Sequence, residues 1–236
     1  MALAAVELGH EYLVLTDHSP SLKVARGLSA ARLRRQLARI REINQELPEG
    51  FRILTGIEVD ILPDGSLDQE PELLAELDVV VGSVHTQLRD HPAQMTRRMV
   101  RAVENPHLDI LGHCTSRKVS AATLGLGTGG DKGHRAGQLR PPIHFDAEAV
   151  FAACAAHDKA VEINSRPDRL DPPKRLLRLA VAAGCRFAID SDAHAPGQLD
   201  WLRFGCQRAV ACGVPPEQVV NTWSADRLRA WAAAHG

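Results

Sequence analysis

The sequence predicts an α/β protein whose parallel sheet is closed, or nearly closed, into a barrel with helices outside. Two observations predict this fold. Apolar β-type runs alternate with helical segments about six times along the chain, a pattern typical of parallel sheets. Most of these runs end in an acidic residue or a histidine. The 236 residues suit one large domain, and no linker divides residues 1–236.

Each expected strand is a short run rich in aliphatic and β-branched residues, as buried parallel strands are. The runs cover residues 12–18, 51–58, 77–85, 108–113, 161–166 and 187–194. The expected helices cover residues 29–47, 71–77, 146–156, 198–211 and 224–234, with two more beginning near 92 and 172.

Local signals place several helix ends. Asp146 and Asp171 are expected to be N-caps, and Gly184 is expected to end the helix that follows Asp171. Helix 29–47 has Leu33 and Leu37 on one face and five arginines on the other. We interpret the arginine face as solvated rather than as a surface that follows a phosphate backbone.

Residues 118–142 are rich in glycine and include Lys132, Arg135 and Arg140. We expect a flexible loop on the same face as the strand ends. Loops of this length are commonly either functional or disordered, and the sequence leaves both alternatives open.

Composition excludes several classes of function. The formal net charge of −1 gives no overall basic field, so a nucleic-acid substrate would have to be held locally. Five cysteines without a paired spacing indicate reduced thiols and a cytoplasmic protein. No apolar run approaches the roughly 18 residues of a membrane span, so we expect no membrane partner. The oligomeric state is left open.

Six polar residues that follow strand ends are the candidate metal ligands. They are His18, Glu58, His85, His113, Asp192 and His194. Because the carboxyl ends of parallel strands meet at one edge, we expect these side chains to converge on a metal or phosphate site. Imidazoles and carboxylates without thiolates suit Zn²⁺, Mn²⁺ or Fe²⁺. Arg166 and Arg117 also follow strand ends and are expected to clamp phosphate oxygens.

Other polar residues near these ends have simpler interpretations. A single histidine at a strand end is more often hydrogen-bonded than metal-bound. We expect Asp17 to orient His18 rather than to bind metal. Cys114 follows His113 and should point to the opposite side, into the core.

Six segments resemble the motif series of the PHP (polymerase and histidinol phosphatase) family, closest to the type associated with bacterial family X DNA polymerases. They read TDHS at 16–19, GIEVD at 56–60, GSVH at 82–85, GHCTSR at 112–117, EINSR at 162–166 and DSDAH at 190–194. The resemblance covers nearly the whole chain in the right order. It implies a distorted (βα)7 TIM-like barrel, up to three divalent metal ions at the strand ends and phosphoesterase activity.

The resemblance also implies a role for each candidate residue. Glu58 would bridge two metals, and His85 and His113 would complete the second. Asp192 would share the first metal with Glu58. Arg166 and Arg117, acting with Asp192, would form the catalytic group that meets the substrate phosphate.

One family motif has no counterpart in this sequence. His18 and His194 would serve the third metal, but the His-x-His pair of the family's first strand is absent. A late start or a fragment competes with true degeneration as the explanation. We expect the former, because residues 1–12 resemble the middle of the family's first helix and the later ligands are intact.

The leading hypothesis is a metal-dependent phosphatase, or a 3'-5' exonuclease and 3'-phosphatase acting on DNA 3' ends, that uses a metal-bound hydroxide. Histidinol phosphatase is the alternative within the family. A noncatalytic module with an incomplete metal centre is the alternative of another class. A metal-dependent amidohydrolase is a weaker third hypothesis, because paired arginines favour phosphate.

Overall fold

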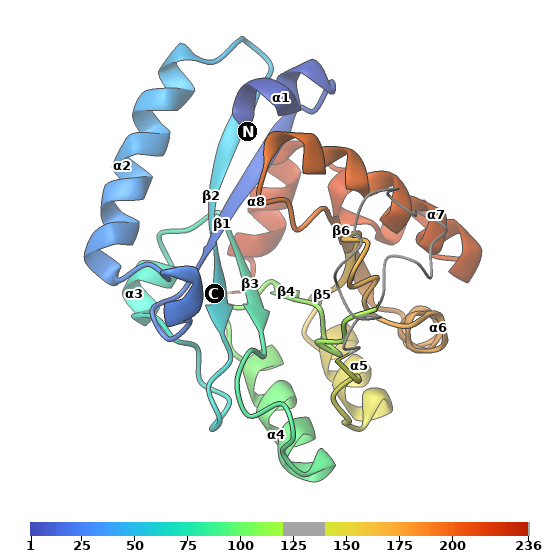
Figure 1. Cartoon of the computed structure of the whole chain (residues 1–236). Helices are drawn as coiled ribbons and strands as arrows, with labels where there is room; N and C mark the ends of the chain where they lie inside the picture. The colour runs from blue at the N-terminus through green and yellow to red at the C-terminus, as the bar shows by residue number, and fades with distance from the viewer. Residues whose placement is uncertain (120–139, 236) are drawn as a thin grey trace, which may run out of the picture.

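The computed structural model describes residues 1–119 and 140–235 and confirms the expected α/β architecture (Figure 1). Its strands are β1 (Tyr12–His18), β2 (Arg52–Asp60), β3 (Val79–Ser83), β4 (Ile110–Leu111), β5 (Ala160–Asn164) and β6 (Arg186–Asp190). All six expected runs therefore form strands. Most of the expected loop 118–142, including Lys132 and Arg135, lies outside the described residues.

The six strands form one parallel sheet in the order β1-β2-β3-β4-β5-β6. The sheet is curled, and within the described residues β1 and β6 are its two edges. The register aligns His18 with Glu58 and Asp60 with Ser83. Polar strand ends that are distant in the sequence therefore meet at one edge of the sheet.

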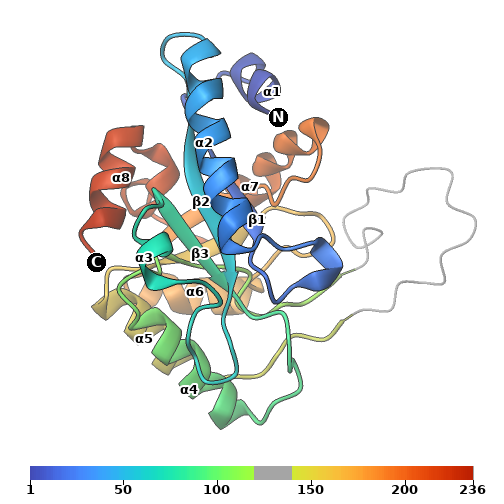
Figure 2. The same cartoon turned by 90° about the vertical axis from the view of Figure 1, so that its left-hand side faces the viewer.

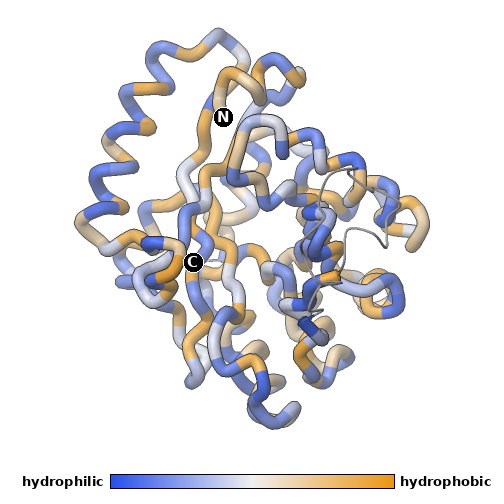
Figure 3. The backbone as a smooth tube through the Cα atoms, viewed as in Figure 1, coloured by the Kyte–Doolittle hydropathy of each residue, from blue (hydrophilic) through white to orange (hydrophobic). Residues whose placement is uncertain are grey.

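Helices follow most of the strands, as the alternation predicts. They are α1 (Ala2–Glu7), α2 (Ala30–Glu46), α3 (Pro71–Leu74), α4 (Pro92–Val103), α5 (Ala147–Ala156), α6 (Lys174–Ala182), α7 (Leu202–Cys212) and α8 (Ala225–Ala233). Figure 1 shows α2, α4, α5, α6 and α7 around the outside of the sheet, and Figure 2 shows α2 lying along β1 and β2. Bands of opposite hydropathy along α2 mark its buried and solvated sides (Figure 3). The five arginines of this helix are exposed to solvent.

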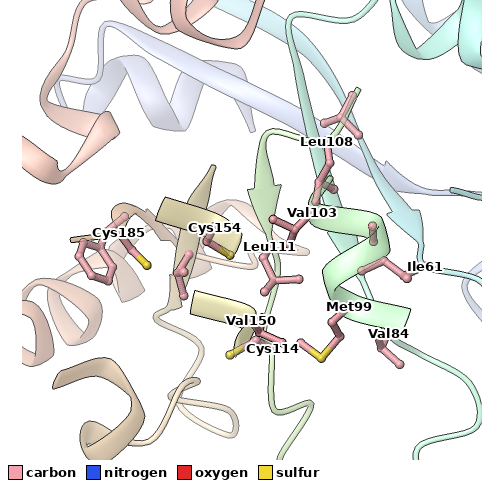
Figure 4. Close-up of a cluster of buried hydrophobic side chains, with 14 of the residues drawn as sticks. Ile61, Val84, Met99, Val103, Leu108, Leu111, Cys114, Val150, Cys154 and Cys185 are labelled. Carbon is pink, nitrogen blue, oxygen red and sulfur yellow. The ribbon is translucent and has the colours of Figure 1, made fainter. Parts of the chain in front are cut away.

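The two faces of the sheet bury separate apolar clusters. The outer cluster joins strand residues such as Ile57 and Leu111 to α2 and α4–α7, and Figure 4 shows Met99 of α4 and Val150 of α5 in this cluster. The inner cluster joins alternate strand residues, such as Leu54, to α8. The sheet face on which this cluster lies is called the α8 face below. Its strand members, Leu54, Val79, Val81, Ile110, Ala160 and Ala188, lie upstream of the polar strand ends.

Three details of the expected helices are tested by the structure. The Asp146 side chain accepts from the Ala149 N–H and caps α5, as expected. Asp171 is not a cap, because α6 has Pro173 at its N-cap and the Asp171 carboxylate is buried against Thr115. The segment expected as one helix over 198–211 is divided into a 3₁₀ turn, Pro196–Trp201, and α7.

Among the helices of residues 1–119 and 140–235, none combines sufficient length with sufficient apolar character to cross a bilayer.

Candidate metal centre

The period of two along each strand places the polar strand ends on the α8 face. In β2, Leu54 belongs to the α8 face, whereas Ile57 and Val59 belong to the outer cluster. Successive side chains of a strand point to opposite sides, so Glu58 and Asp60 follow Leu54 on the α8 face. The same two-residue period places His18 on the side of Val14 in β1 and Asp190 on the side of Ala188 in β6. In β5 it places Glu162 and Asn164 on the side of Ala160. This face is therefore apolar at the strand starts and polar at the strand ends.

Three histidines surround the carboxylate of Glu58. His18 Nδ1 lies 3.3 Å from Glu58 Oε2. On the other oxygen, Oε1, His113 Nε2 lies at 2.9 Å and His85 Nε2 at 3.4 Å. Gly112, just before His113, permits the close packing of the ends of β3 and β4, because a Cβ there would lie 2.3 Å from Ser83 Oγ. The structure thus brings together four of the six expected ligands.

The atoms of this group fit a metal ion. Within the described residues, five of its buried nitrogen and oxygen atoms have no hydrogen-bond partner: His18 Nδ1, Glu58 Oε1, His85 Nε2, His113 Nδ1 and His113 Nε2. Burying polar atoms without partners is costly, and a cation satisfies lone pairs that converge in this way. Ligand atoms of His18, Glu58 and His85 lie within 4.8 Å of one another. Imidazole nitrogens and a carboxylate are the donors that borderline divalent cations prefer.

Charges within the group shift its pKa values. Burial alone would raise the pKa of Glu58, but contacts with His113 and His85 hold it well below its usual range. Burial lowers the pKa of His18, while Glu58 opposes this shift. The structure therefore favours an ionised Glu58 and a neutral His18, which are the protonation states of metal ligands.

Asp60 is a functional candidate that the sequence reasoning missed. Its carboxylate is hydrogen-bonded to Nδ1 of His85, which leaves His85 Nε2 toward Glu58. A carboxylate on the far nitrogen commonly orients a metal-binding histidine. The signal was present in the sequence, because Asp60 stands two residues after Glu58 and so faces the same side of β2.

Asp17 does not orient His18 as expected. Its carboxylate accepts a hydrogen bond from the Gln36 side chain on α2, on the opposite side of the strand. Cys114, by contrast, is buried in the outer cluster, as expected.

A second polar group surrounds Asp192, just beyond β6. Arg169 Nε lies 3.0 Å from Asp192 Oδ2, and Arg166 Nη1 lies 3.6 Å from Asp192 Oδ1. His194 Nδ1 also lies 3.6 Å from Oδ1, and its side chain is 58% exposed. His18, expected to serve the same metal as His194, lies in the group of Glu58 and His85.

Glu162 and Asn164 connect the two groups. The Asn164 amide donates to Glu162 Oε1 and to Asp192 Oδ2, both at 3.2 Å. Glu162 in turn accepts the backbone N–H of His113. Burial, together with the charges of Asp190 and Asp192, raises the pKa of Glu162 well above its usual range. One chain of polar contacts thus runs from the Glu58 group to Asp192.

Arg117 was expected to contact the substrate phosphate, but its guanidinium lies in a different environment. Its guanidinium donates to the backbone carbonyls of Arg169, at 3.1 Å, and Leu170. Burial lowers its pKa, while the charge of Asp171 opposes this shift. This geometry does not support a direct phosphate contact for Arg117. Within the described residues, Asp192 is contacted by Arg166, which was expected in the site as a phosphate ligand, and by Arg169, which the sequence analysis did not select.

Comparison with known proteins gives relatives along nearly the whole chain. The DNA polymerase/3'-5' exonuclease PolX of Bacillus subtilis is 35% identical over 231 residues, which cover 98% of this chain and 37% of that protein. A probable phosphatase of Thermoanaerobacter sp. (strain X514) is 25% identical over 231 residues, covering 94% of this chain and 82% of that protein. The chain thus spans little more than a third of the Bacillus protein but most of the Thermoanaerobacter one. No family model matches the chain.

Among solved structures, histidinol phosphate phosphatase from Lactococcus lactis, complexed with zinc, L-histidinol and phosphate, has a TM-score of 0.57. The match covers 89% of this chain and 85% of that one at 15% sequence identity, so it supports the fold alone. The chain is thus similar along nearly its whole length to proteins named as an exonuclease and as probable phosphatases. Its fold and the order of its motifs resemble those of the PHP (polymerase and histidinol phosphatase) family.

Proposed function

We propose that this chain is a metal-dependent phosphoric ester hydrolase whose centre is Glu58. One observation supports this most strongly: within the described residues, Glu58 and its three histidines have buried nitrogen and oxygen atoms without hydrogen-bond partners, and the carboxylate of Asp192, which two arginines flank, is connected to this group by hydrogen bonds. Cations would bind to Glu58 and its histidines, and the two arginines at Asp192 would bind an anion next to them. A centre of this kind matches a phosphate ester in both charge and shape.

The proposed metal ligands are the six expected residues. They are His18, Glu58, His85, His113, Asp192 and His194. When bound, divalent cations would activate a water molecule and neutralise charge on the phosphoryl group. Among the chain's own residues, Asp60 holds the His85 ring and Arg166 binds a phosphate oxygen. The nitrogen and oxygen ligands suit zinc, manganese or iron, and zinc is present in the Lactococcus structure.

The proposed substrates are DNA 3' ends, with a terminal phosphate or phosphodiester as the group that is cleaved. The relative named PolX, an exonuclease with 35% identity, supports this choice. Histidinol phosphate is the alternative, supported only by a protein of similar fold. The five cysteines are free, which supports the cytoplasmic location that we propose.

A comparison of substrates tests the proposal. The protein loaded with Mn²⁺ is assayed on a 3'-phosphorylated oligonucleotide, on an unmodified one and on histidinol phosphate. We expect turnover of the oligonucleotides, and turnover of histidinol phosphate alone would contradict the DNA assignment. Glu58→Gln should lower the rate on the order of 10³-fold, because it removes several kcal/mol of transition-state stabilisation. Asp64→Asn, on an exposed turn, is the matched control.

The same assay addresses a noncatalytic role. Fewer than one bound metal ion per chain, combined with no hydrolysis of a generic aryl phosphate, would favour a binding module over an enzyme. Metal content measured on the purified protein, before any addition, distinguishes the two outcomes.

A further inference from the structure

We propose that Arg169 is the second phosphate-binding arginine of this centre, and that Arg117 positions it without meeting the substrate. The inference rests on the proposed phosphoesterase function and assigns a specificity residue within that site. Three observations carry it: the donors of Arg169 that lack partners, the way Arg117 is engaged, and the placement of Arg166 and Arg169 around one carboxylate.

The Arg169 guanidinium is enclosed but incompletely satisfied. Its side chain is only 13% exposed. Within the described residues, its buried Nε and Nη1 atoms have no hydrogen-bond partner. Nε lies 3.0 Å from Asp192 Oδ2, but the N–H does not point at that oxygen well enough to form a hydrogen bond. The unused N–H donors of an enclosed arginine can bind an acceptor, and an anion with several oxygens matches the planar arrangement of the guanidinium donors.

Arg117 holds the turn that carries Arg169. Its Nε donates to the Arg169 carbonyl at 3.1 Å, and its Nη2 donates to the Leu170 carbonyl. The turn is also closed from within, because the N–H groups of Arg169 and Leu170 both donate to the Arg166 carbonyl, at 2.9 and 3.0 Å. Leu170 has a φ of 48°, a conformation that such a residue adopts only when its surroundings impose it. The Arg117 guanidinium is therefore occupied by hydrogen bonds to the backbone of the turn at residues 166–170, whereas the Arg169 side chain lies against Asp192.

Arg166 and Arg169 approach different oxygens of Asp192. Arg166 Nη1 lies 3.6 Å from Oδ1, and its Nε is paired with Asp168 Oδ1 at 2.8 Å. Arg169 Nε lies 3.0 Å from Oδ2 of Asp192. The Asn164 amide donates a hydrogen bond to the same oxygen, at 3.2 Å. An anion bound next to Asp192 thus meets one guanidinium from each side. With a cation on Asp192, the positive charge of both arginines is free to act on phosphate.

The test measures the affinity for inorganic phosphate, the product of phosphomonoester hydrolysis, by titration calorimetry on the Mn²⁺-loaded full chain. Arg169→Gln should weaken phosphate binding by about 10- to 100-fold, as loss of a charge-assisted hydrogen bond does. KM should rise with the phosphate dissociation constant, and bound metal per chain should stay at the wild-type level. Arg169→Lys should recover part of the affinity, because it keeps the charge but loses the fork.

Two further variants make the test specific. Arg97→Gln, on the exposed side of α4, is the matched charge control and should leave all readouts unchanged. Arg117→Gln should weaken phosphate binding less than Arg169→Gln does, and it should lower thermal stability, because it acts only through the turn. Stronger weakening by Arg117→Gln than by Arg169→Gln would overturn the assignment.

Other outcomes separate this inference from the function on which it rests. If Arg169→Gln lowers the metal content while its metal-loaded fraction binds phosphate like wild type, Arg169 serves only Asp192 and the inference is wrong. If the wild-type protein turns over esters and Arg169→Gln binds phosphate normally, the inference alone fails. If the loaded wild type neither binds phosphate nor hydrolyses any ester, the proposed function fails and the inference fails with it.

Discussion

The carboxylate of Asp60 is hydrogen-bonded to Nδ1 of His85, so the other ring nitrogen of His85 faces Glu58. Asp60 and His85 belong to neighbouring strand ends, and both side chains are almost completely buried. Because the carboxylate fixes the orientation of the ring, the nitrogen that we propose as a metal ligand already faces Glu58 in the metal-free protein.

Replacing Asp60 by asparagine should weaken metal binding by about 10- to 100-fold, as loss of such a partner typically does. The ring loses its anionic acceptor, while the ligand atoms themselves remain. Competition against a chromogenic chelator measures the affinity, and excess metal should restore most of the hydrolysis rate. The exposed Asp64→Asn variant is the control. Wild-type affinity in Asp60→Asn would show that the hydrogen bond does not support metal binding.

Metal affinity should rise with pH. In the metal-free protein, burial opposes protonation of His85, but Asp60 and Glu58 raise its pKa to about 9. A metal can bind Nε2 only after that proton leaves, so affinity should rise about tenfold per pH unit up to this pKa. Calorimetry in two buffers with different ionisation enthalpies counts the released proton. Affinity that does not change between pH 7 and 9 would contradict the prediction.

The same shift predicts how the stability of the metal-free protein depends on pH. The folded state holds the His85 proton more tightly than the unfolded state, whose pKa is near 6.5. This contribution is complete below pH 6.5 and is lost as the pH rises to about 9, so stability should fall across this window. Urea unfolding in the presence of a chelator measures it, and Zn²⁺ or Mn²⁺ should remove the dependence.

Much of the fold and part of the centre could be predicted because both follow strand periodicity. Apolar runs that end in Glu58, His85 and His113 predicted the strands and also the edge at which their ends meet. Asp60 was equally accessible, since residues two apart share a face of a strand. The strand-end pattern nevertheless assigned a single ligand, Glu58, to this segment and so left Asp60 out.

Arg169 and Asp171 could not be placed from sequence patterns, because neither lies in a periodic element. Arg169 lies in a turn whose shape depends on Arg117, which is 52 residues away in the sequence. Asp171 precedes proline, as helix caps often do, but its carboxylate accepts from Thr115 and from the Arg117 N–H instead. Long-range hydrogen bonds thus overrode a local signal.

Asp171→Asn should therefore destabilise the protein by about 3 kcal/mol, because an amide cannot accept all the hydrogen bonds that the buried carboxylate receives. Urea unfolding measures the change. Asp146→Asn provides the control: asparagine caps helices as well as aspartate does, so its effect should lie within about 0.5 kcal/mol. Equal effects of the two substitutions would show that the buried hydrogen bonds of Asp171 contribute no more to stability than an ordinary helix cap does.

The last prediction separates stability from function along the α8 face. Trp231 of α8 is buried in this apolar cluster at the strand starts, and its Nε1 donates to the Asp158 carbonyl at 3.1 Å and to Oδ2 at 3.0 Å. The proposed metal ligands lie at the opposite ends of the same strands. In barrels of parallel strands, the starts of the strands serve stability and their ends serve chemistry.

Trp231→Ala should cost about 3 to 5 kcal/mol of unfolding free energy. Trp231→Phe keeps the aromatic ring and should cost about 1 kcal/mol for the lost hydrogen bond, together with a smaller loss from reduced packing. Metal content and phosphate affinity of Trp231→Phe, measured well below its unfolding midpoint, should equal those of wild type. A folded Trp231→Phe protein that lost metal would show that the two ends of the α8 face are coupled, because substitution at the strand starts would then have moved Glu58 or its histidines.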